Sequence, residues 1–372
     1  MDKKNYINLA RLPDKSKEYL RYFCKKFNIN EIGRAIDSLK NLRVLIMGDP
    51  ILDEYVYCDF MERTSKDPLI ATKFRRADLW VGGVFAIANQ ISNFTDNLTL
   101  LTSLGKNHRG FIKKRIRNNI KKVFLEEDLE KTIIKRRYID FYRKRKLFEI
   151  YNTNRSNLSR NSEEKIIKFL DKNLSNFDII IISDFGHGLL TPKIREKIQN
   201  KKISIALNTQ LNGGNLGYNF ITNYHRAEFV LLNERELRLP LQEENGEISE
   251  VVEKLRENRD FRDVYITLGK NGAYYSVGKG SIFGQGKVPS FTESSEDTTG
   301  CGDVSFSISS LLNNKKVNFE ITLFLGNLMG AMHSQIIGNE KQISKSELKE
   351  EIHKLFNECK INASHLREKD DK

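Results

Sequence analysis

The sequence has no long hydrophobic run and few cysteines. Its longest unbroken aliphatic stretch covers only residues 179–182, whereas a transmembrane helix needs about 20 apolar residues. The N-terminal residues contain no apolar segment of signal-peptide type. The four cysteines, at positions 24, 58, 301 and 359, lie far apart without a CxxC pair, which argues against a structural zinc site or a disulfide framework. We therefore expect a cytoplasmic protein with no membrane partner.

The charge is strongly basic, with 62 Lys+Arg against 49 Asp+Glu and a formal net charge of +13. Such a charge attracts nucleic acid or phosphorylated metabolites. The basic clusters at 113–115, 121–122, 136–137 and 143–146 are interleaved with apolar residues, which is typical of solvated faces of helices and strands. Because no zinc finger, RNP-type strand or basic heptad accompanies them, we expect no nucleic-acid partner and keep nucleic-acid binding as the least favoured alternative.

Apolar strands alternate with helical segments through most of the 372 residues. This alternation predicts a mostly parallel sheet with helices on both faces. The expected strands are 43–49, 98–104, 178–184, 203–207, 229–232 and 263–268, and the expected helices include 84–94, 193–199, 304–312 and 320–337. Residues 54–80 and 131–151 instead have a β pattern, with 132–138 and 146–151 forming an antiparallel pair. We expect a helical extension over 1–40, one domain over 41–350, and a C-terminal helix and charged tail over 351–372.

The segment DTTGCGD at 297–303, directly before an amphipathic helix, carries the clearest chemistry. Gly300 and Gly302 allow a tight turn that presents backbone amides at a helix N-terminus, which is an anion site. Asp303 falls in the first helical turn, where its carboxylate could accept a proton from an attacking hydroxyl. The alternative is a glycine-rich turn with an ordinary capping aspartate.

This segment resembles the D-T-x-G-A-G-D motif of the ribokinase-like (PfkB) carbohydrate kinases. Further motifs of the family occur in the family's order across residues 41–350. The resemblance implies a three-layer α/β fold with a small β lid, and phosphorylation of a sugar hydroxyl that uses ATP and Mg²⁺. It also implies that Asp303 is the catalytic base and that the amides of Gly300, Cys301 and Gly302 form the anion hole. Cys301 replaces the usual alanine, and its backbone amide is the functional part.

The resemblance implies several nucleotide and cation contacts. Asn233 and Glu236 match N-x-x-E, which is associated with Mg²⁺ through water, and residues 267–272 match T-x-G-x-x-G beside the nucleotide. The nucleotide-binding residues would then be Asn208, Asn233, Glu236, Thr267, Gly269, Gly272 and Asn327, with Asn327 near the adenine. Asp297 and Thr299 would lie near a monovalent cation such as K⁺. A lone N-x-x-E is more often a helix cap, and a lone T-x-G-x-x-G a strand-to-turn corner.

On the substrate side, the resemblance assigns sugar contacts to Asp53 and to the paired glycines Gly82 and Gly83. The family usually reads G-G-x-x-N, but Ala86 occupies the asparagine position and Asn89 follows one helical turn later. We expect Asn89 to contact the substrate, and the substrate's orientation or identity to differ from that of ordinary heptose or ribose. We also expect Asp184, at the end of an isoleucine-rich strand, to contact the sugar or the cation rather than only to end the strand.

Within the family, the chain is most similar to the heptose-phosphate kinase branch, the kinase domain of ADP-heptose synthases. The supporting segments lie at 48–55, 65–68, 132–137, 183–188 and 208–212. Lys135 and Arg137 alternate on a predicted strand and share one face, which would suit a substrate phosphate; a solvated lid face is the alternative. The branch supplies precursors of nucleotide sugars and surface glycans. Because the chain has no H-x-G-H motif, we expect a separate nucleotidyltransferase to act on the product.

Two questions remain open at the level of sequence. The Ala86 substitution allows a regulatory module that kept the fold and lost the sugar site. An isolated lid would expose the apolar faces of its strands to water. The residues concerned are Val56, Ile70, Ile133, Phe148 and Ile150, and their burial predicts a homodimer through the lid. Alternatively, these side chains cover only their own active site.

Overall fold

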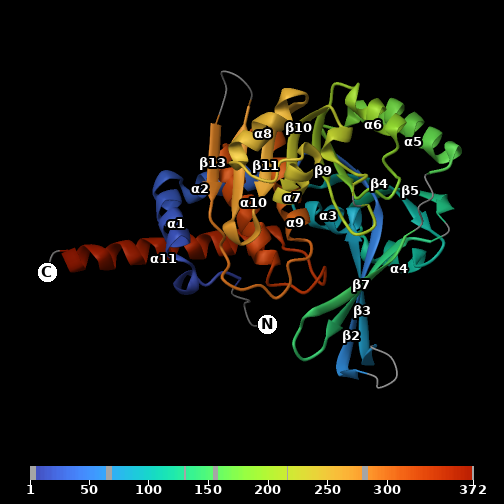
Figure 1. Ribbon diagram of the computed structural model, residues 1–372. Coiled ribbons are helices and arrows are strands. Elements are labelled where there is room, and N and C mark those ends of the chain that lie inside the picture. Colours follow the sequence, from blue (N-terminus) through green and yellow to red (C-terminus); the bar gives the residue numbers. More distant parts are fainter. Residues whose placement is uncertain are drawn as a thin grey trace.

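The computed structural model describes residues 6–63, 69–129, 131–153, 158–215, 217–278 and 284–370. Its centre is a nine-stranded sheet (Figure 1), built from β1 (Arg43–Gly48), β4 (Asn97–Gly105), β5 (Ile120–Leu129), β8 (Ile179–Asp184), β9 (Ser204–Thr209), β10 (Arg226–Asn233), β11 (Asp260–Thr267), β12 (Ala273–Val277) and β13 (Gly284–Val288). The strand order is β13-β12-β11-β10-β9-β8-β1-β4-β5. Neighbours from β5 to β11 are parallel, and β12 and β13 add antiparallel pairs at one edge. The predicted mostly parallel sheet is confirmed.

The central strands are apolar along their whole length because both faces of the sheet are covered. In β1, Val44 and Ile46 belong to one hydrophobic core, whereas Leu45 and Met47 belong to the other. Successive side chains of a strand point to opposite faces, so a strand between two helical layers needs apolar residues at every position.

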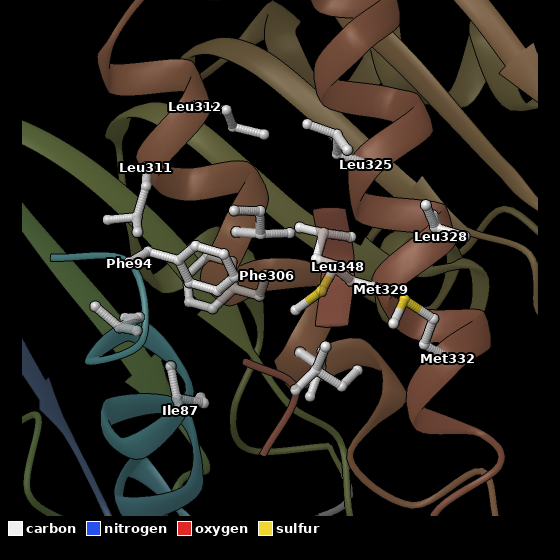
Figure 2. Close-up of a cluster of buried hydrophobic side chains, with 14 of the residues drawn as sticks. Ile87, Phe94, Phe306, Leu311, Leu312, Leu325, Leu328, Met329, Met332 and Leu348 are labelled. Atoms are coloured by element: carbon white, nitrogen blue, oxygen red, sulfur yellow. The ribbon is translucent and has the colours of Figure 1, made fainter. Parts of the chain in front are cut away.

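The helices form the two outer layers. The helices are α1 (Asp14–Lys26), α2 (Ile29–Asp37), α3 (Val84–Ile91), α4 (Arg109–Arg115), α5 (Arg160–Asn173), α6 (Pro192–Gln199), α7 (Glu234–Arg238), α8 (Ile248–Glu257), α9 (Cys301–Asn314), α10 (Phe319–His333) and α11 (Lys345–Asp370). Residues of α3, α9, α10 and α11 share one core, part of which is shown in Figure 2. Residues of α5, α6 and α8 pack into the core on the opposite face. None of the described helices combines the length and apolar character that a membrane span requires.

The N-terminal helices pack against the body of the protein. Phe23 of α1 is fully buried, and its ring stacks on Phe324 of α10 with centroids 4.0 Å apart. At the other end, Ser344 and Glu347 form the capping box that begins α11, because each backbone amide donates to the other residue's side chain. The boundary expected at residue 350 falls inside α11.

A four-stranded lid sheet projects from the body (Figure 1). It comprises β2 (Pro50–Arg63), β3 (Ile70–Gly83), β6 (Ile133–Asp140) and β7 (Lys146–Asn152), in the order β3-β2-β6-β7. β6 and β7 form the predicted antiparallel pair, and β2 pairs parallel with β6. The segment 65–68, cited for its resemblance to the heptose-phosphate kinases, lies outside the described residues.

Candidate active site

A cavity of about 540 Å³ lies where the lid meets the carboxyl ends of β9, β10 and β11. Open α/β sheets bind ligands at this edge. Most of the residues expected from the sequence line it: Asp53, Gly83, Lys135, Arg137, Asn208, Asn233, Glu236, Thr267, Gly269, Gly272, Thr299, Gly300, Cys301, Gly302, Asp303 and Asn327. The fold therefore brings residues from almost the whole chain to one site.

The helix α9 begins at the cavity. Gly300 is its N-cap with φ +82°, and a Cβ at this position would lie 2.9 Å from Nε2 of His333, so only glycine fits both the backbone and the space. The first amides of a helix have no intrahelical acceptor, and here the residues that carry them line a cavity that can hold an anion. Burial raises the pKa of the Cys301 thiol to about 12, so this side chain stays protonated and is no nucleophile.

Asp303 lies in the first turn of α9 and lines the same cavity. Gln210 Nε2 donates a hydrogen bond to its Oδ1 at 2.6 Å, which fixes the orientation of the carboxylate. Burial, reinforced by the negative charge of Asp53, raises the pKa of Asp303 to about 7. A carboxylate with this pKa can take up a proton at neutral pH and release it again.

Asp53 faces the cavity from the lid strand β2. Arg137 Nη1 donates to one carboxylate oxygen at 2.5 Å, and Asn339 Nδ2 donates to the other at 3.0 Å. Gly82 stands directly behind, where a Cβ would overlap the Asp53 carboxylate. The glycine thus permits the close approach, although Gly82 itself does not line the cavity.

Lys135 lies beside this group and is 6% exposed. Its Nζ lies 5.2 Å from the ring centroid of Phe185 and 5.6 Å from that of Tyr151. Among the residues that the structure describes, no carboxylate forms an ion pair with it. Burial lowers the pKa of this ammonium, and a bound anion would reverse that effect because it favours the charged form.

The opposite wall carries the residues expected at the nucleotide. Asn233 and Glu236 form a capping box at the start of α7, so the motif has the helix-capping role that was the structural alternative. Glu236 also accepts a hydrogen bond from the Leu211 amide at 3.1 Å, and burial raises its pKa to about 7. Further along the wall, Asn327 Nδ2 donates to the Pro289 carbonyl at 2.9 Å.

The oxygen atoms available as metal ligands on this wall fit a magnesium ion that is held largely by phosphate and water. Asn208 donates to the Leu231 carbonyl at 2.8 Å, but its buried Oδ1 has no partner. Within the described ranges, no group of three or more His, Cys, Asp or Glu side chains could hold a metal. Mg²⁺ commonly binds proteins through one or two carboxylates plus water and substrate phosphates, and Glu236 with the free Asn208 oxygen suits that role.

The expected monovalent-cation position is filled by a side chain. Lys146 Nζ donates to Asp297 Oδ1 at 2.8 Å and to Thr299 Oγ1 at 2.5 Å. These are the two residues expected to lie near K⁺. The structure does not fit that expectation, because an ammonium group already binds a side-chain oxygen of each residue.

Two expected substrate contacts lie elsewhere. Asn89 is turned away from the cavity, donating to the Arg115 carbonyl at 3.0 Å and accepting from the Arg117 amide at 3.1 Å. Asp184 is buried, and it accepts from the Tyr224 hydroxyl at 2.7 Å and the Gly186 amide at 2.9 Å. Neither residue lines the cavity. Both support neighbouring loops, and the structure brings neither of them to the cavity.

Three polar residues at the site were missed by the sequence analysis. Gln210 lies in the segment 208–212, but only Asn208 of that segment was assigned a role. Asn339 and Lys146 reach the site from a loop after α10 and from the start of β7. No local pattern marks them, and only the tertiary fold brings them to the site.

Comparison with known proteins agrees with this geometry. Residues 79–338 match the model of the "pfkB family carbohydrate kinase". The "Bifunctional protein HldE" of Campylobacter jejuni (strain RM1221) is 25% identical over 272 residues, which cover 72% of this chain and 55% of that protein. The protein of the same name from Geotalea uraniireducens (strain Rf4) is 24% identical over 293 residues, covering 76% and 57%. The chain spans about half the length of the curated relatives it matches.

Solved structures share the fold. Phosphofructokinase-2 from Escherichia coli, in complex with potassium, superposes with a TM-score of 0.67 at 13% identity, covering 84% of this chain and 99% of that one. Ribokinase from Thermotoga maritima gives a TM-score of 0.61 at 16% identity, with the same coverage. The three-layer ribokinase-like architecture expected from the sequence is confirmed.

Proposed function

Because the chain belongs to the PfkB family of carbohydrate kinases, we propose that it transfers the γ-phosphoryl group of ATP to a hydroxyl of a sugar phosphate resembling a heptose phosphate. The observation that carries this proposal is the position of Asp303. It lies between the expected nucleotide wall and the lid residues Asp53, Lys135 and Arg137, on the lining of one cavity. Donor and acceptor can therefore meet at its carboxylate.

Asp303 acts as the general base. It accepts the proton of the attacking hydroxyl, and its pKa of about 7 suits proton uptake at neutral pH. The amides at the start of α9 stabilise the negative charge on the transferring phosphoryl group. Gln210 holds the carboxylate in place through its hydrogen bond.

Glu236 and Asn208, which line the cavity, would hold Mg²⁺ in part through water, and the bound ion would supply charge neutralisation for the nucleotide phosphates. Glu236 is itself oriented by the amides of Asn233 and Leu211, so its position does not depend on the metal.

Lys135 is the reason for proposing a phosphorylated acceptor. The charges of Asp53, Asp303 and Glu149 act on this buried ammonium without forming an ion pair with it in the described residues, and a phosphate of the acceptor would supply a direct partner. The similarity to the HldE proteins supports a heptose phosphate as the model acceptor and a role in making nucleotide-sugar or surface-glycan precursors. Arg137 is already paired with Asp53 at 2.5 Å and with Glu149 at 2.8 Å, so we assign the phosphate contact first to Lys135.

We place this activity in the cytoplasm. No disulfide joins the four cysteines, all of which lie in the described residues, which agrees with a reducing compartment. ATP, the proposed phosphoryl donor, is also a cytoplasmic metabolite.

The proposal is tested by ADP release with a panel of free sugars and their phosphates. We expect turnover with at least one phosphorylated sugar and a loss of about 10²–10⁴-fold in Asp303→Asn, because the general base is removed. Turnover that survives this substitution would contradict the mechanism. Nucleotide binding without turnover on any acceptor would favour a regulatory module, and salt-sensitive RNA binding without turnover would favour a nucleic-acid protein.

A second variant tests the acceptor class. Lys135→Met should raise KM for the phosphorylated sugar about tenfold or more, since one charge-assisted contact is lost, and should leave KM for the free sugar little changed. Lys144→Met, on the outer turn of the same hairpin, is the matched control for lost positive charge. An equal effect of Lys135→Met on both acceptors would contradict a phosphate contact.

A further inference from the structure

A lysine of the lid reaches into the turn that precedes the anion hole. Lys146 is the first residue of β7, and its ammonium lies between Asp297 Oδ1 at 2.8 Å and Thr299 Oγ1 at 2.5 Å. The Asp297 side chain is 5% exposed, whereas that of Lys146 is 36% exposed. The positive charge therefore enters the turn from the solvent side.

Asp297 has four donors, of which only Lys146 is charged. The Tyr55 hydroxyl donates to Oδ2 at 2.5 Å and the Gly338 amide at 2.9 Å, while the Thr299 amide donates to Oδ1 at 3.0 Å. Burial alone would raise the pKa of Asp297, but the Lys146 charge and these hydrogen bonds lower it to about 2. The carboxylate is thus ionised, and Lys146 is its counter-charge.

This turn leads directly into the catalytic helix. Thr299 precedes the N-cap Gly300, and the Thr299 carbonyl oxygen lies 3.2 Å from Nε2 of His333 in α10. Lys146 holds the hydroxyl of Thr299, while α10 holds its carbonyl. Displacement of Thr299 would move the amides that follow it, and small misplacements of catalytic groups are costly.

We propose that Lys146 is a built-in cation, a positioning residue that replaces a bound monovalent ion at the Asp297–Thr299 turn. The ammonium binds Asp297 Oδ1 and Thr299 Oγ1, while Tyr55 and Gly338 donate to Asp297 Oδ2, so the turn does not fit K⁺. The enzyme then needs no added monovalent cation, and the lid contributes directly to the geometry of the anion hole. The activity readout rests on the proposed kinase function, whereas the thermal readout below does not.

The test compares the wild-type protein, Lys146→Met and Lys146→Arg in KCl and in choline chloride at equal ionic strength. Turnover and melting temperature of the wild type should be the same in both salts. Lys146→Met in choline should lose about tenfold or more in turnover with a lower melting temperature, because a buried carboxylate has lost its partner. KCl should restore both by binding at the vacated position. Lys146→Arg, which keeps the charge, should remain insensitive to K⁺.

The control is Arg143→Met, an exposed arginine of the same hairpin turn, which should show no dependence on K⁺. A wild-type protein that KCl activates or stabilises beyond choline would overturn the proposal. So would a Lys146→Met protein that is unaffected in choline, or one that KCl fails to restore, including one that stays unfolded in both salts. If no variant turns over any acceptor, the kinase proposal fails while the melting temperatures still decide the role of Lys146.

Discussion

Asp297 and Asp303 lie six residues apart, yet their environments push their pKa values in opposite directions. Asp297 is paired with an ammonium and three uncharged donors, which lower its pKa to about 2. Asp303 is buried near other carboxylates and has one amide donor, so its pKa rises to about 7. Such a divergence separates the structural carboxylate from the one that exchanges protons.

The raised pKa predicts the pH dependence of the reaction. Because the base acts only when ionised, kcat/KM should fall about tenfold per pH unit below pH 7 and be constant above it. Gln210→Leu removes a hydrogen bond that favours the ionised form, so its profile should shift to higher pH. Initial rates between pH 5 and 9 measure both. A flat profile across this range, or an unshifted one in Gln210→Leu, would contradict the assignment.

The position of Asn89 also has its cause at the residue scale. Asn89 lies one helical turn after Ala86, which suggested a contact with the substrate. In the structure α3 is buried on all sides, and the Asn89 amide instead satisfies backbone groups of Arg115 and Arg117. A buried asparagine needs hydrogen-bond partners wherever it lies, and sequence spacing does not show which ones it finds.

At the scale of elements, the strand ends were predictable and the lid was only partly so. Apolar runs followed by polar residues located the ends of β9, β10 and β11, and with them the cavity wall. The strand β5 was missed because Ile120–Leu129 mixes lysine and acidic residues with apolar ones. Within the described residues it pairs with β4 alone, at the edge of the sheet, where exposure permits charge.

The start of α9 allows a paired test of structure against function. Gly300→Ala places a side chain at φ +82° and against His333, so we expect a loss of about 1–3 kcal/mol in the free energy of unfolding. At Gly302, by contrast, an added Cβ would meet open space, with no neighbouring atom within 4 Å, and this residue lines the cavity. Gly302→Ala should therefore fold normally and lose turnover, because the methyl group narrows the approach of the phosphoryl group to the amides.

Urea unfolding and ADP release separate the two variants. The expected pattern is lowered stability for Gly300→Ala and lowered turnover at normal stability for Gly302→Ala. Equal stability losses would show that both glycines serve only the turn, which was the structural alternative for this motif. Full activity in Gly302→Ala would place the phosphoryl group elsewhere.

At the scale of the whole molecule, the contacts that complete the site join distant parts of the chain. Asp303 meets Gln210, and Asp53 meets Asn339. Lys146 and Asp297 are 151 residues apart. The sequence motifs identified one member of each pair by its resemblance to a family pattern. The other residue of each pair is brought to the site by the sheet topology and the position of the lid. Neither of these can be read from periodicity or spacing in the sequence.

The lid also carries most of the exposed apolar surface. Of the twelve large hydrophobic side chains that are exposed in the described residues, nine lie in the lid region between residues 60 and 150. They are Phe60, Met61, Leu69, Ile70, Phe74, Tyr142, Leu147, Phe148 and Ile150. Two positions expected to need cover, Val56 and Ile133, are buried within the protein itself, whereas Ile70, Phe148 and Ile150 are not.

Such a concentration of apolar side chains on a projecting sheet favours association. We expect a homodimer through the lid, since a second copy offers the same surface in a two-fold arrangement. Phe74, 63% exposed on β3, would be buried in that interface, so Phe74→Glu should give monomers because a buried, unpaired charge is costly. Tyr218→Glu, at a position 88% exposed outside the lid, should remain dimeric. Sedimentation velocity over a range of protein concentrations measures this, and a wild-type monomer would contradict the predicted dimer.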